Sequence, residues 1–169
     1  MTPYQQLWYL QTQADHSVLL VLRKQGAAPC HQLHYLQMVT EKLGKAYFWR
    51  TGGAPPKSHV SFVRFLQTLN DRPRREMERI SKLLGFQSES SLKAWTKTAS
   101  PLAHELQKLA PALAGDDGPN PEYPWPRMAP TYAPASYRFS IWSTLTEASR
   151  GRRFLLFIDQ AVAEFPNYC

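Results

Sequence analysis

Four basic residues in the segment 71–82 are spaced so that a single helical face would carry all of them. They stand zero, three, seven and ten positions from the first, and residues at these offsets share one face of an α-helix. They are Arg72, Arg75, Arg79 and Lys82. Met77, Ile80 and Leu84 form a second, apolar stripe on the same helix. Because guanidinium and ammonium groups neutralise phosphates, the spacing predicts a helix that binds a polyanion, most often nucleic acid.

The overall charge agrees with a polyanionic partner. The chain of 169 residues has a formal net charge of +7 and an isoelectric point near 9.6. A solvated helix face, stabilised by Arg74–Glu78 and Glu78–Lys82 pairs, is the alternative explanation of the basic stripe. It does not explain why four basic residues align while Glu76 and Glu78 lie off their line. Polyanion binding is therefore the favoured interpretation.

Two further basic clusters are candidates for the same role. Arg150, Arg152 and Arg153 surround Gly151, and a glycine allows the close approach of a backbone, including a phosphate backbone. An ordinary polar helix face explains this cluster equally well. The second cluster flanks the loop TGGAPP, where basic residues beside the aromatic run YFW would combine stacking with phosphate contacts. Aromatics in such a sequence are more often part of the core, which is the alternative for this run. The remaining candidates, including those at this loop, are Arg50, Lys57 and Arg64.

The sequence predicts no catalytic, metal or cofactor site. It contains no phosphate-binding loop, HExxH or GxSxG motif and no paired acidic motif, and its thirteen acidic residues are scattered. Cys30, His31 and His34 lie close together, but no downstream pair completes a metal site. We therefore expect a protein that is not an enzyme.

The apolar spacing predicts an all-α fold, a compact bundle of about five to seven helices in a single domain, 1–169. Thr2 and Pro3 are a typical helix start, and Leu7, Leu10 and Val18 continue a helical spacing. This first helix is either continuous or broken near Asp15. The further helices are expected at 30–43, 58–70, 73–85, 88–99, 100–115 and 140–165.

One long irregular segment, 115–135, separates the predicted helices. Its prolines exclude regular helix, and Tyr123, Trp125 and Tyr132 indicate packing against the domain or a partner rather than a solvated linker. The longest apolar run, Val18–Leu22, is far too short to cross a bilayer, and the N-terminal residues do not resemble a signal peptide. We expect a cytoplasmic protein without a membrane partner.

Two other functions are compatible with the pattern. The segment 77–95 places Gly85 between two amphipathic stretches, the rough layout of a helix-turn-helix, so a stand-alone DNA-binding regulator is one alternative. The turn is about a residue too long in most alignments, and core packing of two adjacent helices explains the segment better. A protein-only adaptor, whose basic faces meet acidic partner surfaces, is the other alternative.

Several segments together resemble the small subunit of a type I CRISPR effector complex, most closely that of subtype D, which corresponds to the C-terminal part of the large subunit. They are SHVSFVRFLQTLNDRPRREMERISKLLGF, SLKAWTKTASPLAHELQKLA, the YPW segment and the ending AVAEFPNYC. The resemblance covers most of the chain from about His59 onward and is one of overall sequence, without a diagnostic motif.

The resemblance implies a small helical subunit, present in several copies beside the backbone and large subunits of a crRNA-guided ribonucleoprotein. Its partners would be neighbouring copies of itself and target DNA, with RNA as an alternative ligand. Such a subunit supports the guide–target duplex and the displaced strand. Because base pairing reads the sequence in guided systems, the subunit needs only shape and positive charge.

Overall fold

The computed structural model describes residues 1–51 and 60–169, which form nine α-helices and two short 3₁₀ helices with no strand. The all-α prediction is confirmed. The α-helices are α1 (Pro3–Lys24), α2 (Pro29–Phe48), α3 (Ser61–Leu69), α4 (Arg74–Leu83), α5 (Glu89–Gln107), α6 (Pro111–Ala114), α7 (Ser140–Glu147), α8 (Ser149–Ala163) and α9 (Phe165–Tyr168). The 3₁₀ helices are η1 (Trp49–Thr51) and η2 (Pro134–Ser136).

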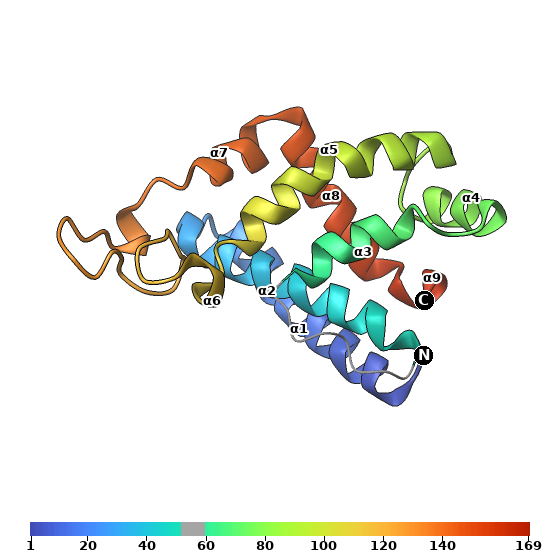
Figure 1. The fold of residues 1–169 in the computed structure, drawn as a ribbon, viewed down its shortest axis with the longest axis horizontal. Helices are drawn as coiled ribbons and strands as arrows, with labels where there is room; N and C mark the ends of the chain where they lie inside the picture. Colours follow the sequence, from blue (N-terminus) through green and yellow to red (C-terminus); the bar gives the residue numbers. More distant parts are fainter. Residues whose placement is uncertain (52–59) are drawn as a thin grey trace.

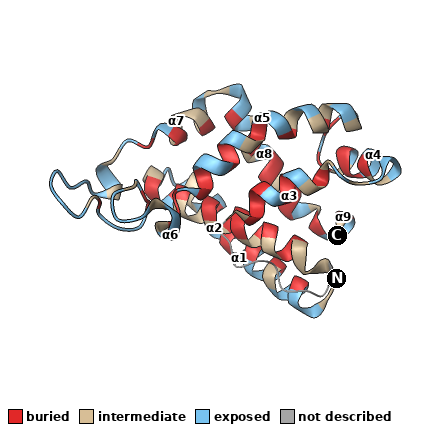
Figure 2. Ribbon diagram, in the orientation of Figure 1, coloured by how far each residue is buried: buried red, intermediate tan, exposed pale blue. Residues whose placement is uncertain are grey.

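The longest helices pack side by side, and the shorter ones close the ends of the molecule. Helix α1 lies along α2 at one edge, α3 crosses α2, and α8 passes behind α3 and α5 (Figure 1). The N- and C-termini lie near each other, whereas α4 and the long irregular segment are at opposite ends (Figure 1). Buried residues concentrate where α2, α3, α5 and α8 face one another (Figure 2).

An aromatic cluster holds α4 and the start of α5 against α8. Phe157, fully buried on α8, lies 4.3 Å from the ring of Trp95 and 6.3 Å from that of Phe86. Phe86 follows α4 directly, and its ring is 5.3 Å from Trp95 on α5. Aromatic pairs at these separations add to the hydrophobic energy of burial. The cluster therefore fixes where the turn between α4 and α5 lies.

Helix α5 is continuous across Pro101, so the prediction of two helices meeting at 100 is wrong. A proline inside a helix removes one backbone hydrogen bond. Here the hydroxyl of Ser100 donates to the carbonyl of Thr96 at 2.8 Å, and Ala99 and Leu102 continue the buried face on both sides of the proline. Apolar packing along the whole helix outweighs the local break.

The predicted final helix, 140–165, is interrupted at Ala148, where α7 ends and α8 begins, and α9 starts only at its last residue. Ala148 has extended backbone angles between α7 and α8. Gly151 then crosses α7 so closely that a Cβ there would lie 2.5 Å from the Cα of Leu145, and closer still to the carbonyl oxygen of Thr144. The absence of a side chain at Gly151 therefore allows the backbone of α8 to pass close to the backbone of α7. The prediction that the glycine admits a phosphate backbone is therefore wrong.

Helix α1 is unbroken and begins with a capping box in which Thr2 accepts from the backbone of Gln5, as its sequence predicts. Its apolar stripe faces outward, however, and its buried side is largely polar. Several of these polar groups have partners in other helices. The hydroxyl of Tyr9 donates to the carbonyl of Val162 at 2.9 Å, and Asp15 pairs with Lys42 of α2.

The irregular segment packs on the rest of the molecule at several points, which include buried Asn120, Trp125 and the ion pair of Glu122 with His34 of α2. Trp125 is only 3% exposed and lies 4.8 Å from the ring of Tyr137 and 5.8 Å from that of Phe139. Tyr123 and Tyr132 remain 59% and 46% exposed. The predicted packing on the domain is confirmed for the tryptophan, whereas packing of the two tyrosines on a partner stays a prediction.

We expect Trp125→Ala to loosen this segment without unfolding the helices. Removing the one buried ring lets the segment open locally, so tryptic cleavage after Arg127 should become about tenfold faster. Mass-spectrometric timing of the first cut measures this rate. Tyr123→Ala, a change in an exposed ring of the same segment, should leave the rate unchanged; equal acceleration by both changes would contradict the anchoring role.

Within residues 1–51 and 60–169, no helix is long and apolar enough to cross a membrane.

Candidate nucleic-acid interface

The basic side of α4 consists of three exposed cations on successive turns. Arg75, Arg79 and Lys82 are exposed, and we call them the α4 basic face. The opposite stripe is fully buried and consists of Met77, Ile80 and Leu84. Pro73 precedes the helix, and Gly85, with a φ of 72°, ends it. The division of α4 into a packing side and a basic side is thus the one that its spacing predicts.

Arg72 does not belong to this face, and its prediction as the first member of the stripe is wrong. It precedes the helix and is partly buried. Its Nε and Nη2 donate to the hydroxyl of buried Tyr47 at 3.0 and 2.8 Å, and its Nη1 lies 2.9 Å from Glu76. Burial lowers the pKa of Arg72, but the bond to Tyr47 and the charge of Glu76 outweigh that and raise it overall. Arg72 therefore anchors the start of α4.

The other end of α4 is held by one cation from outside the face. Arg153 of α8 donates to the carbonyl of Gly85 at 2.8 Å, and its guanidinium lies 4.3 Å from the ring centre of Phe86. Burial lowers the pKa of Arg153. Within the face itself, Arg79 donates to the carbonyl of Asn167 in α9. These contacts make α4 a fixed platform.

The acidic residues of α4 pair away from the face. Glu76 binds Arg72, and Glu78 accepts from Arg74 at 3.3 Å on the flank of the helix. Within the described residues, neither Arg75 nor Lys82 has a hydrogen-bond or ion-pair partner. These two cations are therefore available to an external anion, and exposed Arg79 uses only its Nη1 in the contact with Asn167, so its other guanidinium nitrogens are available as well.

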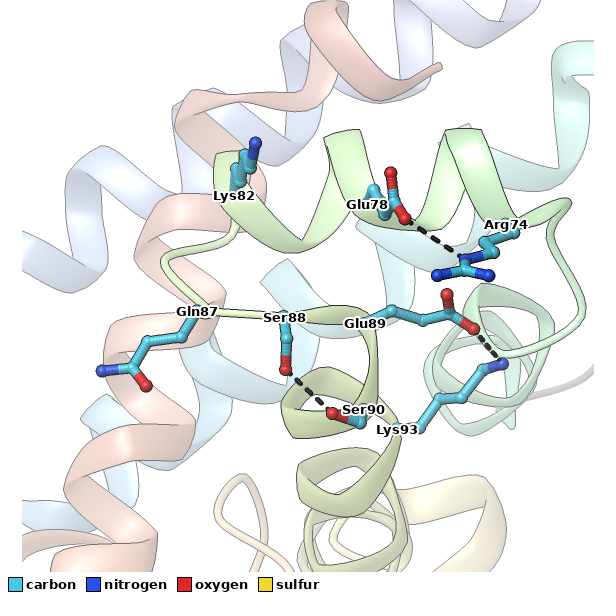
Figure 3. Close-up of a pocket in the computed structure, with 8 residues that line it drawn as sticks. All are labelled: Arg74, Glu78, Lys82, Gln87, Ser88, Glu89, Ser90 and Lys93. Carbon is cyan, nitrogen blue, oxygen red and sulfur yellow. Dashed lines mark hydrogen bonds and ion pairs between the residues drawn. The ribbon is translucent and has the colours of Figure 1, made fainter.

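A shallow hollow of about 610 Å³ lies beside the face, between α4 and the start of α5 (Figure 3). Lys82 lines its rim, and the remaining lining residues are Arg74, Glu78, Gln87, Ser88, Glu89, Ser90 and Lys93. Its carboxylates are already paired, Glu89 with Lys93 at 2.5 Å in addition to the Arg74 pair. The hollow has more cations than carboxylates, so it extends the positive surface without adding a free acid.

The second predicted cluster, beside the loop TGGAPP, is described by the structure only on the side that precedes the loop. Its residues on that side do not form an exposed binding surface. Arg50 lies 4.0 Å from the ring centre of Tyr47, which is fully buried, and Trp49 stacks on Tyr4 at 4.7 Å. The prediction that this aromatic run stacks on bases is wrong for Tyr47, because core packing takes up its ring. Lys57 lies outside the described residues. Arg64 is exposed on α3, as a binding residue requires.

The three arginines around Gly151 have different roles. Arg152 donates to the carbonyl of Glu147 at 2.5 Å and so caps the end of α7. Arg153 holds the turn after α4, as described above. Only Arg150 is both exposed and without a described partner. The prediction of one phosphate-binding cluster is wrong for Arg152 and Arg153, whose guanidinium groups satisfy helix-end carbonyls.

The thiol of Cys169, near the partly buried Arg50 and Arg72, gives a pH-dependent prediction. Burial raises the pKa of the Cys169 thiol to about 12, although Arg50 and Arg72 partly oppose this. The unfolded chain loses this proton at lower pH than the folded chain, so stability falls as pH rises from about 9 toward 12. Melting temperatures of wild type and Cys169→Ser at pH 7 and 10.5 measure the effect. The wild type should lose more stability than the variant, and parallel losses would contradict the assignment.

Sequence reasoning missed Arg74 and Lys93 at the hollow and the role of Tyr47 as the partner of two arginines. The i,i+4 spacings of Arg74–Glu78 and Glu89–Lys93 predict the two ion pairs. They do not predict that both pairs line the same hollow. Nothing in the sequence connects Tyr47 with Arg72. No protein-family model, curated protein or solved structure matches the chain.

Proposed function

We propose that this protein is a non-catalytic nucleic-acid-binding subunit that holds a phosphate backbone on the α4 basic face. The observation that carries the proposal is the pairing of both α4 glutamates away from this face. It leaves Arg75 and Lys82 unneutralised, while Arg79 remains exposed beside them. Fixed, exposed cations on one side of a helix are the usual means of contacting phosphates.

The length of the α4 basic face is compatible with binding a nucleic-acid backbone without recognising its bases. Arg75 and Lys82 are two turns apart, about 10 Å along the helix axis. That distance matches about three phosphates at one charge per ~3.4 Å of a strand. Arginine and lysine here would contact phosphate oxygens, which carry no sequence information. The expected ligand is therefore a nucleic-acid strand of any sequence.

The finer proposal is a place in a crRNA-guided CRISPR effector complex, as its small subunit. It rests on the sequence resemblance from about residue 59 onward. A compact helical protein with one fixed basic face is compatible with supporting target DNA in such a complex, where base pairing supplies the specificity. In that setting the protein is cytoplasmic, and its partners are the backbone and large subunits.

A stand-alone regulator is the second candidate. It is favoured by the succession of α4, the Gly85 turn and the Ser88-capped start of α5. The start of α5 carries Glu89, however, and a carboxylate at the leading end of a recognition helix would be repelled by DNA phosphates. Backbone binding by α4 is therefore the better-supported function.

Fluorescence-anisotropy titration tests the proposal. Single- and double-stranded DNA and RNA of two unrelated sequences are each titrated at several salt concentrations. We expect binding that differs little between sequences, with a log–log salt slope of about −2 to −3 from three phosphate contacts. Strong preference for one duplex sequence would instead support the regulator, and no binding at low salt would reject both.

Co-purification tests the finer proposal separately. The tagged protein, expressed in its native host, should be isolated with a short RNA and several larger proteins. Isolation of the protein without RNA would contradict membership of a guided complex, even if the titration shows backbone binding.

A further inference from the structure

The outer side of α1 is an exposed apolar stripe, and Tyr4 at its start stacks on Trp49 of η1 at 4.7 Å. Its large side chains are between 38% and 61% exposed, and they are Tyr4, Leu7, Leu10, Val18 and Val21. They recur at helical spacing along one side, whereas α2 and α8 cover the other side through Tyr9, Asp15 and Leu19. Helix α1 lies at the edge of the molecule, and its outward turns are exposed (Figures 1 and 2).

This stripe is also free of charge. Between Pro3 and Leu22 the only titratable acid and base are Asp15 and His16, and both point inward. Asp15 pairs with Lys42, and His16 lies 2.7 Å from Asp159. Depletion of charge at the centre of an exposed apolar surface is typical of protein–protein interfaces.

The absence of charge decides between possible occupants. A membrane-surface helix carries lysine and arginine beside its apolar side, and α1 has none before Arg23. Nucleic acid would find no cation on this stripe. Two copies of a chain with net charge +7, by contrast, repel each other over most of their surfaces but can meet here without bringing like charges together.

The stripe is also complementary to itself. When two copies of α1 lie antiparallel about a two-fold axis at the middle of the helix, larger side chains at one end face valines at the other. The facing pairs are Tyr4 with Val21, Leu7 with Val18, and Gln11 with Ala14. These positions follow the alternating three- and four-residue spacing of a helix–helix seam. A two-fold interface requires this kind of self-complementary surface.

We propose that the protein forms a homodimer through an antiparallel α1–α1 contact along this stripe. The paired region, residues 4–21, is about 26 Å long at 1.5 Å per residue. Covering its exposed side chains in both copies removes on the order of 1,000 Å² of surface, the lower limit for a specific interface. The dimer is therefore concentration-dependent. The proposal rests on α1 alone and stands whether or not the α4 basic face binds nucleic acid.

Sedimentation velocity over a wide protein concentration range tests the association. The wild type should shift from monomer to dimer, and Leu7→Glu should weaken the dimer at least tenfold, because it places a charge opposite Val18 in both halves. Leu156→Glu on α8 is the matched control, since Leu156 is 48% exposed outside the stripe. A monomeric wild type at all concentrations, or equal effects of the two variants, would overturn the proposal.

Cysteine cross-linking tests the antiparallel register. In a Cys169→Ser background, an equimolar mixture of Leu7→Cys and Val18→Cys proteins should form a disulfide-linked dimer under mild oxidation. Leu7→Cys alone should not, because its two copies lie about 16 Å apart along the seam. Cross-linking of Leu7→Cys with itself would overturn the arrangement, and circular dichroism of each variant confirms that the helices are retained.

Discussion

Replacing Arg75, Arg79 and Lys82 together by alanine should weaken nucleic-acid binding on the order of 100-fold at 0.1 M salt, because three phosphate contacts are lost. The log–log salt slope should become shallower by about two to three. Alanine favours helix, and the packing stripe of Met77, Ile80 and Leu84 is untouched, so the fold should remain. Anisotropy titrations of wild type and variant at several salt concentrations give both quantities.

The control removes the same charge elsewhere. Lys24, Lys108 and Arg138 are exposed, and they lie at the end of α1, just after α5 and just before α7. These parts of the chain lie away from α4 (Figure 1). Their triple replacement by alanine lowers the net charge equally, so it should cause only a small, general loss of affinity. Equal losses in the two variants would show that total charge, and not the α4 basic face, determines binding. An unchanged affinity in the α4 variant would show that the α4 basic face does not bind nucleic acid and is only a solvated helix face.

Gly151→Ala should destabilise the protein by about 2 to 3 kcal/mol, although alanine normally stabilises a helix relative to glycine by about 1 kcal/mol. The added methyl group would lie 2.5 Å from the Cα of Leu145, which is backbone and cannot rotate away. The crossing of α7 and α8 must therefore widen. For a chain of this length, we expect the melting temperature to fall by about 5 to 10 °C.

Matched changes in the same turn separate packing from helix propensity. Ser149→Ala and Arg150→Ala lie at exposed positions beside Gly151, and each should alter stability by no more than about 0.5 kcal/mol. Thermal melts followed by circular dichroism measure all three variants. A higher melting temperature for Gly151→Ala would mean that the crossing adjusts without cost and that helix propensity dominates.

Local spacing was sufficient to predict most of the helices and the two sides of α4. Met77, Ile80 and Leu84 recur with the helical period, so they alone define the buried side, and Arg75, Arg79 and Lys82 must then lie opposite. Thr2 and Pro3 likewise define the start of α1, because a cap acts within one turn of its residue. Such features depend on neighbours three or four positions away, which the sequence displays directly.

Helix boundaries were less predictable where distant packing overrides a local signal. Pro101 is a typical helix start but lies inside α5, since the apolar face on either side of it packs as one surface. Gly151 marks a close crossing of α8 over Thr144 and Leu145, which no pattern within α8 reveals.

The sequence by itself therefore determined that the protein is helical, basic, and equipped with a helix that has one cationic side. Only the tertiary structure decided which cations are available. Arg72 and Arg153 lie close in sequence to exposed arginines, yet their guanidinium groups bind Tyr47 and the carbonyl of Gly85. Their partners are 25 and 68 positions away along the chain, and the need of buried polar groups for hydrogen bonds is satisfied by whichever groups folding brings near.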